Sequence, residues 1–183
     1  TVAEHTFALI LALTRKLYPS IKRTHEEDAF ETDIGLRGMD LKGKKLGVIG
    51  FGNIGQKVAS LLSPFNCEIL VNDIIDYNEK CNSLNCKFLD KEEIYQKSEL
   101  LTLHIPYDDS THNLISSSEF EIMNSNQVLI NTSRGNIVDE SALLQALQNG
   151  KIRAAAFDVF SQEPCVDSEL LKLDNFFATP HIG

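Results

Sequence analysis

The chain has 183 residues, of which 26 are acidic and 17 basic, so its formal net charge is −9 with histidine neutral. Apolar residues make up 43% and charged residues 23%, which are ordinary values for a globular protein, and the length suits a single domain. The acidic balance argues against a nucleic-acid partner, which requires a basic surface. The longest apolar run, residues 7–13, is too short to cross a membrane, and no basic segment precedes it as in a secretory signal.

The positions of the four cysteines argue against a disulfide-stabilised protein and against a zinc site. They stand at positions 67, 81, 86 and 165, which does not form a disulfide framework in a chain of this length. No CxxC pair and no Cys/His spacing typical of a zinc site occurs, so no metal is expected. Reduced thiols and a cytoplasmic location are therefore the expectation.

The chain begins with a helical pattern and then changes to alternating elements. An apolar stripe predicts a helix over residues 3–17, closed by Pro19, followed by a polar, irregular stretch over 19–43. From residue 45 onwards, short apolar runs at 46–49, 68–71, 100–104, 128–130, 154–157 and 176–178 predict strands, and segments at 54–63, 91–97, 117–123 and 140–149 predict helices. Continuous apolar strands separated by helices are typical of βαβ units. The predicted fold is α/β, with a doubly wound parallel sheet of about seven strands.

Polar residues follow the predicted strands at the points where they end. Because ligands bind beyond the carboxyl ends of the strands in such sheets, we expect these residues to line one edge. They are the loop 50–55, Asp73, residues 104–106, residues 132–135, Asp158 with Glu163, and His181.

A glycine-rich loop lies between the first strand and the helix after it. In the pattern Gly50-x-Gly52-x-x-Gly55, the first glycine permits a tight turn, the second admits a pyrophosphate and the third lets the helix pack closely on the sheet. Asp73 follows Gly55 by 18 residues, near the spacing expected of the acid that binds the adenosine ribose. No basic residue stands between Asp73 and Lys80, so a 2′-phosphate would meet an uncompensated carboxylate. The sequence therefore predicts a Rossmann-type domain that binds NAD rather than NADP.

Three further residues suggest a reaction. Taken singly, Arg134, Glu163 and His181 would be a surface ion-pair residue, a loop acid and a structural histidine. Taken together beside a nicotinamide, a histidine paired with a carboxylate can give a proton to a carbonyl oxygen as hydride reaches the carbon. An arginine can hold a substrate carboxylate in a bidentate fork. This chemistry is the reversible reduction of a 2-oxo acid. His5, His25 and His112 are expected to be ordinary helix or loop residues.

With these residues in place, the chain resembles the D-isomer-specific 2-hydroxyacid dehydrogenases, the family of phosphoglycerate, D-lactate and glycerate dehydrogenases. The matching segments run in order along nearly the whole chain, at 2–6, 43–50, 103–106, 111–115, 130–140, 157–164 and 179–183. The resemblance implies that Arg134 binds substrate, that His181 is the acid–base group and that Glu163 is its partner. It also implies cofactor contacts at Gly50, Gly52, Asn53, Ile54, Gly55, Asp73, His104, Ile105, Pro106, Thr132, Ser133, Asp158 and Gly183.

The same resemblance bears on domain organisation. Residues 1–183 match the NAD-binding domain alone, with residues 1–18 as a crossover and interface helix, and the substrate domain is expected to lie outside the chain. A homodimer through this domain is implied. The chain alone is expected to bind NAD with little or no turnover, because a site with one wall cannot exclude water.

Some features depart from the family pattern or leave alternatives open. No Trp occurs, and Phe157 stands where a smaller aliphatic residue is usual. Glu163 argues against the formate dehydrogenase branch, which carries Gln there. An NAD-sensing, corepressor-like binding protein on the same scaffold is the main alternative, and a Rossmann hydrolase with transient oxidation is a third. The substrate stays open among 3-phosphoglycerate, glycerate or hydroxypyruvate, and D-lactate.

Overall fold

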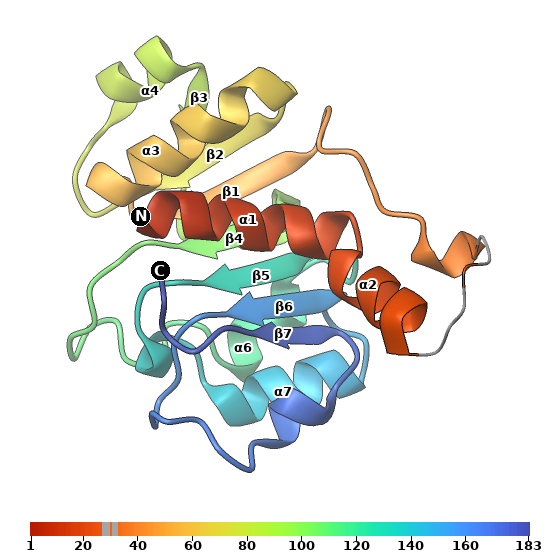
Figure 1. Cartoon of the computed structure of the whole chain (residues 1–183). Coiled ribbons are helices and arrows are strands. Elements are labelled where there is room, and N and C mark those ends of the chain that lie inside the picture. The colour runs from red at the N-terminus through yellow and green to blue at the C-terminus, as the bar shows by residue number, and fades with distance from the viewer. Residues whose placement is uncertain (27–29, 31–32) are drawn as a thin grey trace.

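A parallel sheet of seven strands forms the centre of the molecule (Figure 1). The computed structural model describes residues 1–26, 30 and 33–183. The strands are β1 (Lys45–Ile49), β2 (Glu68–Asn72), β3 (Cys86–Phe88), β4 (Leu100–Leu103), β5 (Val128–Asn131), β6 (Ala154–Phe157) and β7 (Phe176–Ala178). Their order across the sheet is β3-β2-β1-β4-β5-β6-β7, so the winding reverses between β1 and β4. The predicted α/β, doubly wound sheet is confirmed.

Helices cover both faces of this sheet. They are α1 (Val2–Thr14), α2 (Leu17–Glu26), α3 (Asn53–Leu62), α4 (Asn78–Leu84), α5 (Lys91–Lys97), α6 (Ser117–Ile122) and α7 (Glu140–Gln148), with 3-10 turns η1 (Ile34–Leu36), η2 (Ser63–Phe65), η3 (Gly135–Ile137) and η4 (Glu169–Lys172). Buried residues of α1 and α3 pack on one face, and those of α5, α6 and α7 pack on the other. In the part of the chain that the structure describes, no helix is long and apolar enough to cross a membrane.

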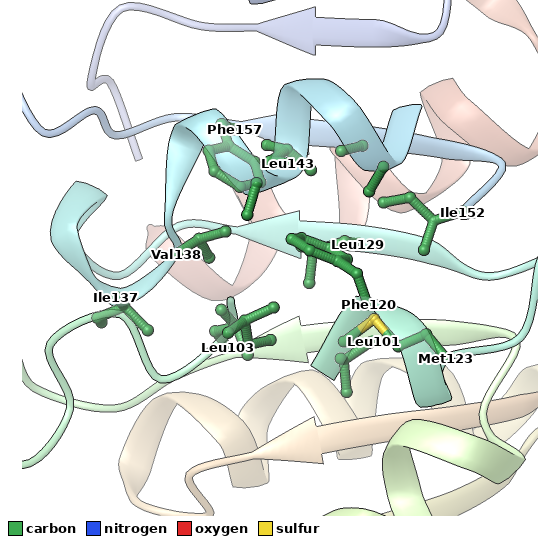
Figure 2. Packing of buried hydrophobic residues seen from close by; sticks show 14 of the residues in the cluster. Leu101, Leu103, Phe120, Met123, Leu129, Ile137, Val138, Leu143, Ile152 and Phe157 are labelled. Atoms are coloured by element: carbon green, nitrogen blue, oxygen red, sulfur yellow. The ribbon is translucent and has the colours of Figure 1, made fainter. Parts of the chain in front are cut away.

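Two hydrophobic clusters, one on each face, fix the strands. Successive residues of a strand alternate between them: Leu129 belongs to one cluster and Ile130 to the other, and both are fully buried. Figure 2 shows the first cluster, in which Phe120 and Leu143 pack over Leu129 from α6 and α7. Burial of one such side chain contributes about 1.5–3 kcal/mol. The strands are therefore held firmly from both sides, and so are the residues at their ends.

The register of the strands aligns their carboxyl ends. Ile49 of β1 pairs with Leu103 of β4, which pairs with Asn131 of β5, which in turn pairs with Phe157 of β6. Because each of these residues ends its strand, the next residue along the chain emerges at one common edge. This edge carries Gly50, Asp73, His104, Thr132, Asp158 and Thr179.

The first helix differs from the prediction of one helix over 3–17 closed by Pro19. α1 ends at Thr14, and Lys16 adopts a left-handed conformation (φ 52°) that separates it from α2. Pro19 lies inside α2 as its third residue. Proline is tolerated there because an N–H in the first turn has no helical partner. Pro19 therefore lies inside the second helix, whereas it was predicted to close the first.

Two short elements were not located from the sequence, and the stretch 19–43 was predicted to be irregular. α4 has a single buried residue, Cys81, and β3 has only three residues at the sheet edge, so neither has a clear apolar pattern. Within 19–43 the structure has most of α2 and all of η1. Residues 27–29 and 31–32 of that stretch lie outside the described residues.

Candidate functional site

The glycine loop between β1 and α3 is shaped by close backbone contacts. Gly50 has φ 92°, and a Cβ atom on it would lie 2.4 Å from the carbonyl oxygen of His104. A Cβ atom on Gly55 would lie 2.0 Å from the carbonyl oxygen of Gly50. A Cβ atom on Gly52, in contrast, would meet nothing within 4 Å. Two glycines therefore serve the fold, and the third borders open space.

That open space lies at the amino end of α3, where Asn53 and Ile54 begin the helix. Gly52 is the N-cap residue and supplies no side-chain cap, so the first N–H groups of the helix are available to a ligand. The positive end of the helix dipole points to the same place. An uncapped amino end beside an open glycine fits the pyrophosphate of a dinucleotide.

Asp73, the residue after β2, is fixed against this loop. Its Oδ2 accepts a hydrogen bond of 2.6 Å from the backbone N–H of Phe51, and its Oδ1 accepts one of 3.0 Å from Ile75. The side chain remains partly exposed. Each carboxylate oxygen keeps a lone pair, so the group can still accept hydrogen bonds from a ribose.

A cavity of about 540 Å³ continues from the loop towards β5. His104 lies on its wall, with Nε2 3.0 Å from the Thr102 hydroxyl and Nδ1 buried without a hydrogen-bond partner. Burial lowers the pKa of His104 to about 4, so the imidazole is neutral at pH 7. The sequence-predicted residues that line the cavity are Ile54, His104, Ile105, Pro106, Thr132, Ser133 and Arg134.

The three residues after β5 differ in what they bind. The Thr132 hydroxyl lies 2.8 Å from that of Thr6 in α1, and the Ser133 hydroxyl donates 2.5 Å to the carbonyl oxygen of Leu103. Arg134 is exposed, and among the described residues its guanidinium reaches only the Ser133 carbonyl oxygen, at 2.6 Å. The two hydroxyls are used by the fold, whereas the guanidinium can receive an anion.

Glu163 and His181 form a hydrogen-bonded pair at the same edge. The His181 Nδ1 lies 2.7 Å from the Glu163 Oε2, while the Glu163 Oε1 accepts a bond of 2.9 Å from the N–H of Phe160. Both hydrogen bonds lower the pKa of Glu163, and the bond from His181 has the larger effect. Glu163 is therefore a carboxylate at neutral pH. Nδ1 is engaged, which leaves Nε2 for a substrate. The pair borders a cavity of about 330 Å³, and Cys165 lies on the wall of this cavity.

Arg134 is not in contact with this pair. It lies in the 540 Å³ cavity, whereas Glu163 and His181 line the smaller one. Their loops nevertheless touch, because a Cβ atom on Gly135 would lie 1.9 Å from the carbonyl carbon of Phe160. Only glycine permits this approach, so the residue after Arg134 sets how close the two loops come.

Asp158 is almost fully buried, at 1% exposure. Its Oδ1 accepts hydrogen bonds from the Thr179 hydroxyl and the Ile182 N–H, and its Oδ2 accepts one from the Gly183 N–H. Burial raises the pKa of Asp158, but these bonds and the nearby His5 outweigh burial, so the net shift is downward. The Asp158 carboxylate is thus occupied by hydrogen bonds to the chain on either side of His181. The resemblance had implied that Asp158 and Gly183 both contact the cofactor.

His5 and Thr6 were missed as members of this region. His5 was expected to be an ordinary helix residue, yet its Nε2 lies 2.9 Å from the Thr179 hydroxyl and 3.3 Å from Asp158. The only signal in the sequence was their place in segment 2–6, one of those that carry the resemblance. No spacing rule could have connected positions 5 and 179.

This fold and this arrangement of side chains at the sheet edge are those of one protein family. Residues 7–183 match the family model described as D-isomer specific 2-hydroxyacid dehydrogenase, NAD binding domain. The chain belongs to this family, and the resemblance predicted from its motifs is confirmed.

Individual relatives agree with that assignment. The chain is 38% identical over 184 residues to D-3-phosphoglycerate dehydrogenase of Archaeoglobus fulgidus, and 36% identical over 186 residues to glyoxylate reductase of Thermococcus litoralis. These matches cover 100% and 99% of this chain, but 34% and 56% of the relatives. The crystal structure of D-lactate dehydrogenase from Aquifex aeolicus complexed with NAD and lactic acid superposes with a TM-score of 0.90 at 34% identity, covering 99% of this chain and 59% of that one. The chain therefore spans well under two thirds of the length of these relatives.

Proposed function

We propose that the chain is the cofactor-binding part of an NAD-dependent enzyme that interconverts a D-2-hydroxy acid and its 2-oxo acid. One observation carries this proposal: the Glu163–His181 pair, at 2.7 Å, lies at the same sheet edge as the glycine loop and Asp73. An acid–base pair beside a dinucleotide site is the minimum that hydride transfer to a carbonyl requires.

The residues divide the chemical work among them. NAD, when bound, supplies or accepts the hydride. His181 donates a proton to the carbonyl oxygen through Nε2, because its Nδ1 is held by Glu163, and in the reverse direction it removes that proton. Glu163 accepts the hydrogen bond from Nδ1 and so fixes the orientation of the ring. Arg134 holds the substrate carboxylate and polarises the neighbouring carbonyl.

The choice of NAD over NADP rests on Asp73. Its carboxylate is anchored by Phe51 and Ile75, so it cannot swing away from an added phosphate. A 2′-phosphate placed there would be repelled, whereas ribose hydroxyls would be accepted as donors. Asp73 therefore selects the cofactor by both attraction and repulsion.

Titration of the chain with NADH and NADPH, followed by the fluorescence of the nicotinamide, tests the cofactor site. Gly52→Val should weaken NADH binding by about 10-fold or more, since the side chain fills the space that the pyrophosphate needs. Thermal unfolding of this variant should change little, because the new side chain meets no protein atom within 4 Å at Cβ.

A matched variant separates binding from folding. Gly55→Ala places a Cβ atom 2.0 Å from the Gly50 carbonyl oxygen and should lower the melting temperature. Asp73→Ala should narrow the preference for NADH over NADPH. Equal binding of NADH by the wild type and Gly52→Val would contradict this placement of the cofactor.

We propose that turnover requires a larger protein of which this chain is one part. The relatives extend well beyond the matched region, and Arg134, Glu163 and His181 are all exposed. A second domain that closes over Arg134 and His181 would exclude water from the reaction. We therefore expect NADH oxidation with 2-oxo acids to be slight or absent in this chain alone.

A homodimer is also proposed, through α1 and α2. Leu17, Tyr18 and Ile21 are between 46% and 59% exposed, and α2 projects beyond the sheet (Figure 1). A second copy covering these side chains would bury an apolar surface that is costly to expose. Light scattering should give twice the mass of the chain, and Ile21→Glu should halve it. A monomeric wild type would contradict this part of the proposal.

A further inference from the structure

A partly buried polar cluster connects α1 to the segment that carries His181. We define the anchor cluster as His5, Asp158 and Thr179. The Thr179 hydroxyl lies 2.5 Å from the Asp158 Oδ1 and 2.9 Å from the His5 Nε2, and His5 Nε2 lies 3.3 Å from the same Asp158 oxygen. Three segments that are far apart in the sequence therefore meet at one hydroxyl group.

The donors and acceptors of this cluster can be assigned. Asp158 is a carboxylate and accepts only, so the Thr179 hydroxyl donates to it. A hydroxyl that donates its one hydrogen can accept from His5, whose Nε2–H is therefore the donor. His5 thus fixes the direction of the Thr179 hydroxyl, and through it the alignment with Asp158.

Asp158 holds the backbone immediately after His181. It accepts from the N–H of Ile182 at 3.0 Å and of Gly183 at 2.9 Å, and Thr179 lies two residues before His181. Between these fixed points, His181 has φ 53°, in the left-handed region. This region is unfavourable for a residue with a side chain, so the surrounding contacts must maintain it.

His5 itself is firmly placed. Its imidazole is 16% exposed, and the next residue, Thr6, is bonded through its hydroxyl to Thr132 at 2.8 Å. α1 therefore contacts both the loop after β5 and the segment after β7. Of the anchor cluster, only His5 comes from outside the sheet edge.

We propose that His5 is a positioning residue for His181. It acts through Thr179 and Asp158 and keeps the His181 ring against Glu163. This inference rests on the proposed acid–base role of His181 for its functional meaning, but the positioning itself can be measured without turnover. Loss of His5 frees the segment 179–183, so that the ring spends less time on Glu163 and Nδ1 is no longer the preferred protonated nitrogen.

The test is ¹⁵N NMR of the histidine rings in this chain, at a pH where His181 is neutral. The wild type should show His181 as the Nδ1–H tautomer, because Glu163 accepts from that atom. His5→Leu should give a mixture of tautomers, whereas His5→Gln should restore the wild-type signal, since its amide N–H can replace Nε2–H. His25→Leu, at an exposed position in α2, is the matched control and should leave the His181 signal unchanged.

Three results for His5→Leu would overturn the inference: a pure Nδ1–H tautomer of His181, a lower melting temperature with no change in the His181 signal, or a spectrum equal to that of the His25→Leu control. If His5→Leu does not fold, Thr179→Val against Thr179→Ser measures the same ring, with loss expected for valine and retention for serine. In the whole protein, His5→Leu should lower kcat by up to about 10²-fold, the range for a misplaced catalytic group. Full turnover of the whole protein after His181→Ala would instead refute the proposed function. The NMR comparison of the wild type with the His5 variants would still stand.

Discussion

The two halves of the sheet edge are built differently. In the half with β1 and β2, the loop is fixed by residues close in sequence: the N–H of Phe51 bonds Asp73, 22 positions away. In the half with β5, β6 and β7, the Glu163–His181 pair is also close in sequence, but this half is tied to α1 by contacts that span most of the chain, such as Thr6 with Thr132, 126 positions apart, and His5 with Thr179, 174 apart. The cofactor half is thus a local motif, whereas the half proposed for proton transfer depends on packing of the whole fold.

Removal of the proposed acid–base group gives the largest expected effect and separates the two halves. In the whole protein, His181→Ala should lower turnover by about 10²–10⁴-fold, because the proton for the carbonyl oxygen is lost. NADH affinity, measured by fluorescence titration, should be unchanged, since the glycine loop and Asp73 are unaffected. Turnover equal to that of the wild type would contradict the acid–base role.

The aromatic packing under the Glu163 loop gives the next effect. Phe157 is fully buried, with its ring centroid 5.5 Å from that of Phe176 and 6.4 Å from that of Phe160. Phe157→Ala should lower the free energy of unfolding by about 3–5 kcal/mol, measured by urea denaturation. Ile74→Ala, at a fully exposed position, is the control and should change it by less than about 0.5 kcal/mol. Equal effects of the two substitutions would show that this aromatic packing does not stabilise the fold.

The cofactor half contains the buried His104, which should make the folded state less stable in acid. Burial lowers the pKa of His104 from 6.5 to about 4 in the folded state. Between these values the unfolded chain binds one more proton than the folded chain, so stability falls as pH decreases. From pH 7 to pH 5 the contribution of this group should fall by about 2 kcal/mol.

Comparison with a neutral variant isolates this effect from the carboxylates. His104→Gln should lose less stability between pH 7 and pH 5 than the wild type in urea denaturation. An identical loss in both proteins would show that His104 does not titrate in this range.

Much of the fold could be predicted from the sequence because its parallel strands are apolar on both faces. Six of the seven strands and five of the helices have apolar runs or stripes that identify them. The exceptions were α4 and β3, which bury few side chains, and the break after α1, which depends on the left-handed Lys16. Pro19 was misinterpreted because its effect depends on whether it stands in the first turn or beyond it.

The site could be predicted only as far as strand ends and motifs reveal it. Asp73, Arg134 and Asp158 follow strands directly, so the parallel topology itself places them at one edge. His5 emerges from a helix, and its contact with Thr179 depends on how α1 crosses the sheet. That crossing is set by side-chain packing on β5 and β6, which no spacing in the sequence expresses.

The aligned strand ends also have a practical consequence. Since all seven strands run in the same direction, the turns that precede them lie on the opposite side of the molecule from the proposed chemistry. Gly43 and Gly150 lie in two such turns, with φ 74° and 67° that disfavour a side chain, but their neighbours Lys42 and Lys151 are exposed. A fluorophore, an affinity handle or a surface tether placed near them should therefore leave both cavities free, so that cofactor binding can be followed on an immobilised protein.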